Sequence, residues 1–404
     1  MNVSVIGQGY VGLNIAIAAA NAGHTVIGLD IDADLIKNLN LGINHVPGIS
    51  QEVLVHLIRS KKYRPTTENN LISESDIFVI AVPTPLDSSR GPDLSYVEAA
   101  SKVISEFSAD NTLIVNESTS YPGTLRKFIK PLVEQNSGKN LFFASAPERV
   151  DPGNTDWNLE NTPRVVAGIG EVATRKVQAF YSSFCKFIHV APNVEVAEAS
   201  KLFENTFRQV NIALVNEFSE IAHSLNFSTH DAIAAASTKP FGYMAFLPSI
   251  GVGGHCIPVD PSYLSYIARL SGVKTNFINL ANETNLMVHK KIVTRINDYI
   301  GGTLEGKLIQ VAGIAYKPNV SDLRESPSLL LIEELKKSGA EVSWCDPMVK
   351  ELNGDISKSL STDVDIGLIV TPHDQIDFSI WKNSNVMVLD ISASTKDFGW
   401  PKFL

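Results

Sequence analysis

The stretch Gly7-Gln8-Gly9-Tyr10-Val11-Gly12 follows an apolar run at residues 3–6 and opens a segment with a helical pattern. A second apolar run, residues 25–29, leads directly into Asp30. A glycine-rich turn between a strand and a helix, followed by an acidic residue at the end of the next strand, is typical of a dinucleotide site. The glycine string alone is a weak signal, but this context predicts that the chain binds a dinucleotide.

The residue type at position 30 favours NAD over NADP. An aspartate accepts hydrogen bonds from the ribose hydroxyls of the adenosine, and its charge repels a 2′-phosphate. The alternative is that Asp30 is only a turn residue at the end of a strand. Thr84 and Thr119 follow two later apolar runs, at the sheet edge where ligands of open α/β sheets bind, although either residue is equally typical of a turn.

Short β-branched runs alternate with helical stretches over residues 1–190, which predicts an α/β fold with a doubly wound parallel sheet. A later unit begins at residue 307 and repeats this pattern. Residues 21–30 and 337–346 share a helix end, a glycine, a strand and a terminal aspartate, so two Rossmann-like halves are expected. The second half lacks the glycine fingerprint and carries Lys317 and Arg324, which suit the diphosphate of a different nucleotide.

Between residues 193 and 225, apolar side chains recur at steps of three and four, which predicts one long helix. Such a helix extends on the order of 50 Å, so we expect it to join two domains and to form a homodimer or a higher homo-oligomer. The expected domains are an NAD-binding Rossmann domain at 1–192, a central helical region at 193–300 and a Rossmann-like domain that binds a second nucleotide at 301–404.

Composition excludes several classes of protein. The 404 residues carry a net charge of −9, which argues against a nucleic-acid partner. The 3 cysteines are too few for a disulfide framework and indicate a reducing compartment, so a cytoplasmic location is expected. The first strand leaves no room for a signal peptide and no apolar run approaches a membrane span, so no membrane partner is expected. No metal site is expected.

Cys256 lies in the loop Gly251-Val252-Gly253-Gly254-His255-Cys256 and is a candidate nucleophile. Glycines let the backbone approach a ligand closely. Asp260-Pro261 resembles the start of a helix over residues 262–270, and a thiolate is favoured near a helix N-terminus. An unpaired cysteine is more often a small buried hydrophobe, and Asp260 is explained equally by capping alone. His255 is left without a role.

Lys201, Asn205 and Arg208 fall on one stripe of the long helix. A solvated polar face is the ordinary explanation for such a stripe. However, asparagine is a poor residue for a helix interior, and a Lys-Asn pair one turn apart supplies convergent donors for a developing oxyanion. Glu148 follows another strand, where a carboxylate can activate water or simply pair with Arg149.

Together these motifs resemble those of the UDP-glucose/GDP-mannose dehydrogenase family. The resemblance covers nearly the whole chain and rests on motifs that appear in the family's order: Gly-x-Gly-Tyr-Val-Gly, Val-Pro-Thr-Pro, Glu-Ser-Thr, Pro-Glu-Arg, the helix with Lys201 and Asn205, Gly-Gly-His-Cys-Ile-Pro-Val-Asp-Pro, and Ala-Tyr-Lys-Pro. The resemblance implies two Rossmann-like domains joined by a long helix. It also implies oxidation of the C6 alcohol of a nucleotide sugar to a carboxylate with two molecules of NAD.

The resemblance also implies roles for individual residues. Cys256 would attack the C6 aldehyde, Lys201 and Asn205 would stabilise oxygen charge, and Glu148 would activate the water that hydrolyses the thioester, assisted by Thr119 and Asp260. The residues expected to bind NAD are Gly7, Gly9, Tyr10, Val11, Gly12, Asp30, Thr84, Thr119 and Arg324. Those expected to bind the substrate are Glu148, Arg149, Lys201, Asn205, Arg208, Phe241, Tyr243, Gly253 and Lys317.

The continuation of Pro-Glu with Arg149-Val150-Asp151 is similar to the branch of the family that acts on UDP-N-acetylhexosamines. UDP-N-acetylglucosamine is the favoured substrate, and UDP-N-acetylmannosamine and UDP-glucose are the alternatives. Two other functions compete with this one. A β-hydroxyacid dehydrogenase would use a helical lysine and asparagine without a thiol, and an NAD-sensing protein would perform no chemistry.

Overall fold

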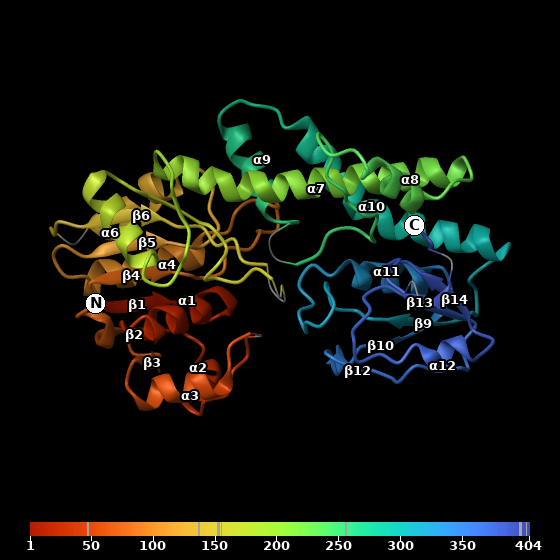
Figure 1. Cartoon of the computed structure of the whole chain (residues 1–404), viewed down its shortest axis with the longest axis horizontal. Helices are drawn as coiled ribbons and strands as arrows, with labels where there is room; N and C mark the ends of the chain where they lie inside the picture. The colour runs from red at the N-terminus through yellow and green to blue at the C-terminus, as the bar shows by residue number, and fades with distance from the viewer. Residues whose placement is uncertain are drawn as a thin grey trace. The chain divides into compact units, whose positions relative to one another are not determined.

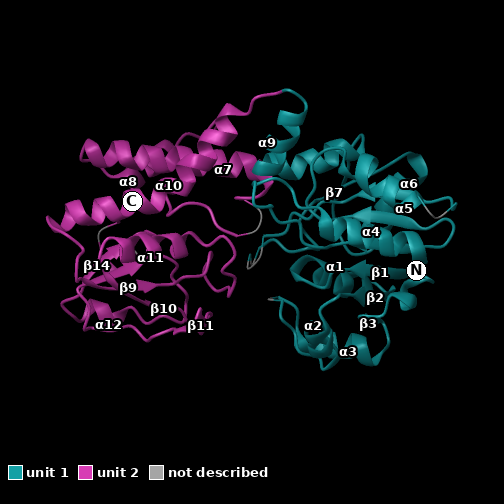
Figure 2. Ribbon diagram, turned by 180° about the vertical axis from the view of Figure 1, so that it is seen from behind, with its two compact units in different colours: residues 1–204, 262–272 teal, residues 205–261, 273–404 magenta. Residues whose placement is uncertain are grey.

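The computed structural model describes residues 1–46, 48–135, 138–151, 154, 156–254, 257–395, 398–400 and 402–404. These residues form two compact units (Figure 2). Unit 1 comprises residues 1–204 and 262–272, and unit 2 comprises residues 205–261 and 273–404. Each unit has its own sheet and its own hydrophobic core, as the labelled strands show (Figure 1).

Unit 1 is built on an eight-stranded sheet in the order β3-β2-β1-β4-β5-β6-β7-β8. Its strands are β1 (Asn2–Ile6), β2 (Thr25–Leu29), β3 (Tyr63–Thr66), β4 (Ile77–Ile80), β5 (Leu113–Asn116), β6 (Phe142–Ser145), β7 (Arg164–Gly168) and β8 (Ile188–Val190). Its helices are α1 (Tyr10–Asn21), α2 (Ala33–Asn40), α3 (Gln51–Arg59), α4 (Ser95–Phe107), α5 (Lys130–Glu134), α6 (Glu171–Tyr181) and the short η1 (Asn69–Ile72) and η2 (Leu125–Ile129). The doubly wound α/β fold is therefore confirmed.

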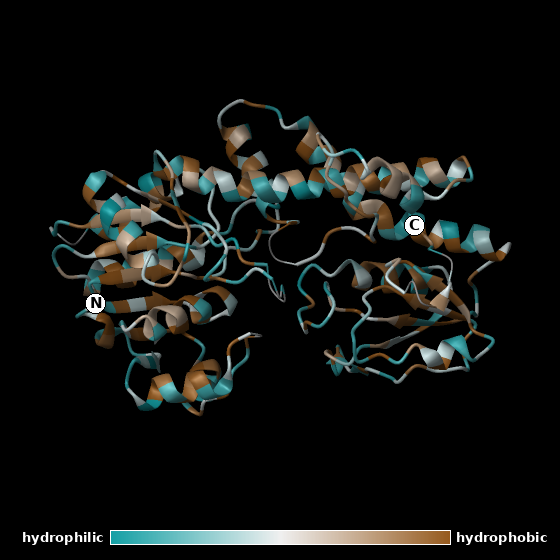
Figure 3. Ribbon diagram, viewed as in Figure 1, coloured by the Kyte–Doolittle hydropathy of each residue, from teal (hydrophilic) through white to brown (hydrophobic). Residues whose placement is uncertain are grey.

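Both faces of this sheet are covered, because alternate residues of each strand enter different cores. Val79 of β4 packs in one core with residues of α1 and α6. Its neighbours Phe78 and Ile80 pack in the other with residues of α4 and α5. A strand buried on both sides is mostly apolar, and the strands of this sheet are largely brown in Figure 3.

One strand pair departs from the expected parallel sheet. β6 and β7 are antiparallel, with Ala144 opposite Gly168 and Ser145 opposite Ala167, whereas the other pairs of this sheet are parallel. The alternating sequence pattern did not predict this reversal. A parallel crossover normally contains a helix, and the described residues between β6 and β7 form none. The sequence pattern also missed the edge strands β3 and β8.

Unit 2 holds a parallel four-stranded sheet in the order β10-β9-β13-β14. Its strands are β9 (Leu308–Ala312), β10 (Glu341–Cys345), β13 (Ile366–Ile369) and β14 (Met387–Asp390), beside a small hairpin of β11 (Glu351–Leu352) and β12 (Asp355–Ile356). Its helices are α8 (Thr229–Ala236), α10 (Asn276–Ile300), α11 (Pro327–Lys337) and α12 (Ser379–Lys382). The order matches half of a Rossmann sheet, as the internal sequence echo predicts.

The helix α7 (Val194–Ser224) begins in unit 1 and ends in unit 2, and α9 (Asp260–Leu270) starts at Asp260 itself. The apolar stripe of α7 does not form a core. Phe203, Leu214 and Ile221 are exposed, whereas the polar side chains of Glu198, Lys201 and Gln209 are buried. A polar face turned inward is suited to a site, and the exposed stripe is suited to a partner. Within the described residues, no helix combines the length and apolarity needed to cross a bilayer.

Candidate active site

The glycine loop between β1 and α1 fits a dinucleotide. Gly7 has a φ of +91°, and a Cβ there would lie 2.5 Å from the carbonyl oxygen of Ala81, so the turn requires glycine. A Cβ on Gly9, in contrast, would meet nothing within 4 Å, so this side of the loop is open. Gly9 is also the N-cap of α1 and supplies no capping side chain. A bare helix N-terminus beside an open loop is suited to a pyrophosphate.

Asp30 is held in place by the same loop. One carboxylate oxygen of Asp30 accepts the backbone N–H of Gln8 at 2.6 Å, and the other accepts that of Asp32 at 3.0 Å. The buried side chain of Gln8 is anchored in turn by the hydroxyl of Tyr63 at 2.7 Å. Each carboxylate oxygen accepts about two hydrogen bonds, so Asp30 retains acceptor capacity for a ribose. The residues present therefore fit NAD.

Thr119 and Lys201 come together in unit 1. The Nζ atom of Lys201 donates a hydrogen bond of 2.7 Å to the hydroxyl oxygen of Thr119, and Lys201 is only 7% exposed. The alternative of a solvated stripe is therefore wrong at this position. Thr84 lies in the loop after β4, where its carbonyl oxygen accepts the hydroxyl of Tyr263 at 3.0 Å.

Glu198 lies one helical turn before Lys201 and was not predicted from the sequence. Its carboxylate accepts the backbone N–H groups of Gly123 at 2.6 Å and Leu125 at 2.8 Å. Burial raises the pKa of Glu198 to about 7, although these N–H groups act in the opposite direction. Lys201 and Glu198 therefore hold the loop that carries Thr119 at two points.

Glu148 belongs to a buried charged cluster. Oε2 of Glu148 accepts a hydrogen bond from Arg164 at 2.9 Å, and Arg164 also pairs with Glu117. Burial pushes the pKa of Glu148 upward, but the charge and hydrogen bond of Arg164, the N–H of Val150 and the charge of Lys201 outweigh burial and hold it below its ordinary value. Glu148 is therefore ionised at neutral pH, as a base must be.

Asn205 and Asp260 meet in unit 2. The side-chain amide of Asn205 donates a hydrogen bond of 2.6 Å to Oδ2 of Asp260, whose side chain is fully buried. The structure thus links two residues that the sequence analysis placed in one site for different reasons. Cys256 and His255 lie outside the described residues.

The glycines before Cys256 are explained differently by the structure. A Cβ on Gly253 would lie 2.9 Å from Tyr316 and from Pro327, and one on Gly254 would lie 2.9 Å from the ring of Tyr316. The backbone N–H of Gly254 also bonds the carbonyl of Arg324 at 3.1 Å. The absence of side chains at Gly253 and Gly254 therefore lets the loop of residues 316–327 pack closely against this backbone. The two glycines are not explained by a ligand alone.

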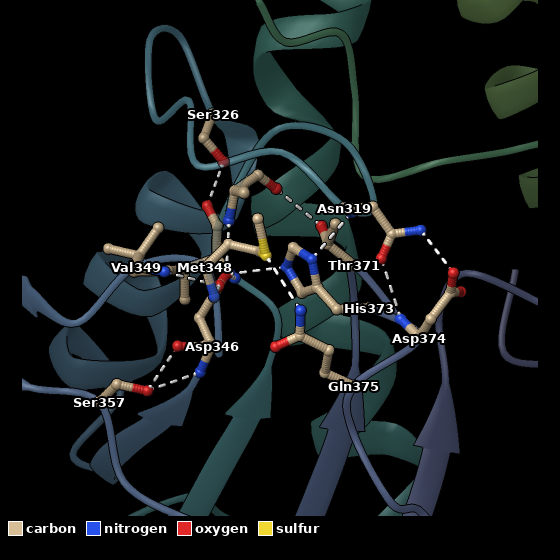
Figure 4. A network of polar contacts seen from close by, with 12 residues as sticks. Asn319, Ser326, Asp346, Met348, Val349, Ser357, Thr371, His373, Asp374 and Gln375 are labelled. Carbon is tan, nitrogen blue, oxygen red and sulfur yellow. Dashed lines mark hydrogen bonds and ion pairs between the residues drawn. The ribbon is translucent and has the colours of Figure 1, made fainter. Parts of the chain in front are cut away.

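Asp346 shows how the second half differs from the first (Figure 4). One oxygen accepts the N–H groups of Ile314 and Ala315 at 2.8 and 3.0 Å, and Nε2 of His373 lies 3.0 Å from the same atom. The other oxygen accepts the N–H groups of Met348 and Val349. A carboxylate used so fully has no acceptor left for a ribose.

The tautomer of His373 follows from its contacts. The backbone N–H of Asn319 donates to Nδ1 at 2.9 Å, so Nε2 carries the proton and donates it to Asp346. Asn319 lies two residues after Lys317, and this network therefore fixes the loop on which Lys317 is carried (Figure 4).

The remaining expected site residues lie as follows. The guanidinium of Arg149 pairs with Glu204 at 2.7 Å, and that of the exposed Arg324 pairs with Asp322 at 2.6 Å. Arg208, Phe241 and Tyr243 are exposed, and Lys317 is half-buried. These positions are compatible with ligand contacts.

The glycine loop, Asp30 and the doubly wound sheet define a dinucleotide-binding protein of the Rossmann class. Three matches to known families cover most of the chain. They are the NAD binding domain of the UDP-glucose/GDP-mannose dehydrogenase family at residues 1–185, its central domain at 195–286 and its UDP binding domain at 310–395. The chain belongs to this family and is an NAD-dependent UDP-sugar dehydrogenase.

Individual relatives point in the same direction. The chain is 34% identical to UDP-N-acetyl-D-mannosamine dehydrogenase of Pyrococcus horikoshii, over 95% of this chain and 92% of that protein. A solved structure of UDP-D-ManNAc dehydrogenase from Pyrococcus horikoshii has a TM-score of 0.87 at 33% identity, covering 96% of this chain and 95% of that one. UDP-N-acetyl-D-glucosamine 6-dehydrogenase of Pseudomonas aeruginosa is 30% identical over 86% of this chain and 83% of that protein.

Proposed function

We propose that this enzyme oxidises the C6 alcohol of UDP-N-acetyl-D-mannosamine to the carboxylate. The sequence motifs favoured UDP-N-acetylglucosamine as the substrate, with UDP-N-acetylmannosamine and UDP-glucose as alternatives. The relative named UDP-N-acetyl-D-mannosamine dehydrogenase supports the first of these alternatives. It is 34% identical over 95% of this chain, whereas the relative named UDP-N-acetyl-D-glucosamine 6-dehydrogenase is 30% identical over 86%. The two sugars differ in configuration at one carbon, so their discrimination depends on pocket geometry.

The observation that carries the proposed chemistry is the hydrogen bond of Lys201 to Thr119. It fixes a buried ammonium group, whose charge also reaches Glu148. A fixed cation in a water-poor site stabilises an oxyanion more strongly than a mobile one in water. We therefore assign to Lys201 and Asn205 the stabilisation of oxygen charge during oxidation, with Asp260 orienting the amide of Asn205.

Cys256 is proposed as the nucleophile that holds the C6 carbon between the two oxidations. Its thiolate adds to the aldehyde, and loss of the second hydride leaves a thioester. Water then attacks the thioester carbonyl carbon. Glu148 takes the water's proton, the C–S bond breaks, and Cys256 leaves as a thiolate. The tether prevents the aldehyde from escaping before it is fully oxidised.

NAD, when bound, accepts the hydride in each oxidation. We propose that Gly7, Gly9, Tyr10, Val11 and Gly12 cradle its pyrophosphate, and that Asp30 binds the adenosine ribose. We assign Thr84, Thr119 and Arg324 to NAD binding as well. The proposed substrate contacts, beyond Glu148, Lys201 and Asn205, are Arg149, Arg208, Phe241, Tyr243, Gly253 and Lys317.

We also propose the larger organisation expected from the sequence. The functional segments are residues 1–192 for NAD, 193–300 for the central helices and 301–404 for the UDP-sugar. The partner of the exposed α7 stripe is proposed to be a second copy of this chain, because Phe203, Phe207 and Leu214 form an apolar face that a monomer leaves in water.

A substrate panel tests the function. The purified enzyme is supplied with NAD and, separately, UDP-N-acetylmannosamine, UDP-N-acetylglucosamine and UDP-glucose, and NADH and uronate are quantified. We expect the highest kcat/KM with the mannosamine sugar and two NADH per uronate. A higher kcat/KM with UDP-N-acetylglucosamine would reject the proposed substrate. One NADH per product would reject the twofold oxidation and favour chemistry without a thiol.

A further inference from the structure

Arg164 lies between two buried carboxylates of unit 1. Its guanidinium pairs with Glu117 on one side and donates to Oε2 of Glu148 at 2.9 Å on the other. The exposed fractions of the side chains are 3% for Arg164, 0% for Glu117 and 8% for Glu148. One cation thus compensates two carboxylates in a place where water cannot do so.

The antiparallel pairing of β6 and β7 explains this position. Ala144 lies opposite Gly168 and Ser145 opposite Ala167. The same register, continued past the end of β6, places Arg164 opposite Glu148. In a parallel arrangement the start of β7 would lie at the other edge of the sheet, far from Glu148.

Arg164 is itself held from two further sides. Its Nη2 atom donates to the carbonyl oxygen of Ala146 at 2.9 Å, and its guanidinium carbon lies 4.9 Å from the centroid of the Tyr181 ring. The hydroxyl of Tyr181 donates to Glu117, which closes the cluster. A guanidinium stacked on an aromatic ring and bonded at several nitrogens has little freedom to turn away from Glu148.

The acceptor directions of Glu148 are nearly all used. Oε1 accepts the backbone N–H groups of Arg149 and Val150, both at 2.7 Å, and Oε2 accepts Arg164. A carboxylate offers about four acceptor directions. Contacts within the described part of the chain therefore leave one direction, on the oxygen that Arg164 holds.

We propose that Arg164 is a positioning residue for thioester hydrolysis: it keeps Glu148 ionised and turns the remaining acceptor direction of Oε2 toward the attacking water. This inference rests on the proposed role of Glu148. The other titratable or charged groups that face the cluster are Glu117, Tyr181, Cys185 and Lys201. Without Arg164, the two buried carboxylates would lose the cation that they share, and the smaller effect of Lys201 on Glu148 would not replace it, so the pKa of both Glu117 and Glu148 would rise. A protonated Glu148 cannot accept the proton of water.

The test follows the acyl-enzyme. Arg164→Gln, Arg164→Lys and Glu148→Gln are prepared in the full chain. Arg175→Gln is the matched control, because Arg175 is 65% exposed and pairs with Glu171 on its own helix. Each variant is mixed with NAD and the best UDP-sugar of the panel. NADH formation is followed through the first turnover and in the steady state, and the intact protein is weighed for a covalent adduct.

For Arg164→Gln we expect kcat to fall about 100-fold, which is the lower end of a general-base contribution. Because an acyl-enzyme that accumulates lowers KM together with kcat, kcat/KM should change less than about threefold. The first turnover should still release two NADH, and the thioester adduct should accumulate. Arg164→Lys keeps the positive charge but loses the planar guanidinium that donates from two nitrogens. This variant should recover part of kcat, and its profile of kcat against pH should be shifted to higher pH. Arg175→Gln should behave as the wild type.

The outcomes separate the two claims. If Glu148→Gln accumulates adduct but both Arg164 variants hydrolyse it at the wild-type rate, the inference about Arg164 is wrong and Glu148 keeps its role. If Glu148→Gln itself accumulates no adduct, the proposed role of Glu148 fails. Should Arg164→Gln fail to fold, Arg164→Lys decides: wild-type kcat and an unshifted pH profile would overturn the inference.

Discussion

Lys201 and Thr119 are 82 residues apart in the chain, and the ammonium of one lies 2.7 Å from the hydroxyl oxygen of the other. Lys201 lies on α7 and Thr119 lies in the loop after β5. Their contact therefore joins the helix to the carboxyl edge of the sheet. Because Glu198 binds the same loop from one turn earlier on α7, the position of Lys201 is set before any ligand arrives.

Lys201→Ala should lower kcat by about 100-fold or more and leave the Kd for NAD nearly unchanged. An oxyanion donor contributes chiefly when charge develops in the transition state. Steady-state kinetics and calorimetric titration with NAD measure the two quantities. Lys186→Ala is the control, since this lysine is 59% exposed. Parallel weakening of NAD binding would assign Lys201 to the cofactor instead.

Asp30→Asn should raise the KM for NAD about tenfold, which corresponds to about 1.4 kcal/mol, and should improve the use of NADP. The amide oxygen retains one acceptor, but the charge that repels a 2′-phosphate is gone. Initial rates with both cofactors provide the measurement. The exposed Asp34, in the first turn of α2, supplies the control variant Asp34→Asn. An unchanged NAD requirement would show that Asp30 is only a turn residue.

Asp346→Asn should destabilise the protein by about 2 kcal/mol or more, because the new amide cannot accept all the N–H groups that the carboxylate accepts. Asp30→Asn, at the equivalent strand end, should cost far less stability. Chemical denaturation of both variants makes the comparison. Equal effects would mean that the buried network around His373 adds nothing to the stability of unit 2.

Glu198→Gln should change how stability depends on pH. Because burial raises the pKa of Glu198 to about 7, its contribution to stability is present below the unfolded pKa and is lost as pH rises through 7. This loss is on the order of 3 kcal/mol. Glutamine does not titrate, so the variant shows no such loss of stability as pH rises. Glutamine also offers only one oxygen to the N–H groups of Gly123 and Leu125, which makes the variant less stable at low pH.

The variant should therefore be less stable than the wild type at pH 5, and the difference should shrink toward pH 8. Denaturant unfolding at several values of pH measures it. A difference that stays constant over this range would mean that Glu198 is already ionised at pH 5.

Leu214→Asp should convert the proposed dimer into a monomer. Leu214 is 62% exposed at the middle of the α7 stripe, and a second copy of the helix would bury a charge there. Sedimentation velocity at working concentration distinguishes the two states, with Glu217→Gln as the control on the same helix. A wild-type enzyme that is already monomeric would reject the dimer.

The doubly wound fold, the glycine loop with Asp30 and the long helix α7 could all be predicted from the amino-acid sequence. These features are local: a glycine at a forced turn, apolar strands and a helical period are written in neighbouring residues. The sequence also assigned Lys201, Asn205, Glu148 and Cys256 to one active site. That assignment rested on the order of the family's motifs and not on the spacing of the residues.

Which side chains contact one another became visible only in the folded chain. The reversal at β7 places Arg164 beside Glu148, and neither Arg164 nor Glu117 carries a local signal of that contact. The same holds for Asp346, which ends its strand as Asp30 does but is buried in a network of backbone N–H groups. Strand direction and burial depend on contacts between distant segments, and such contacts leave no period in the sequence.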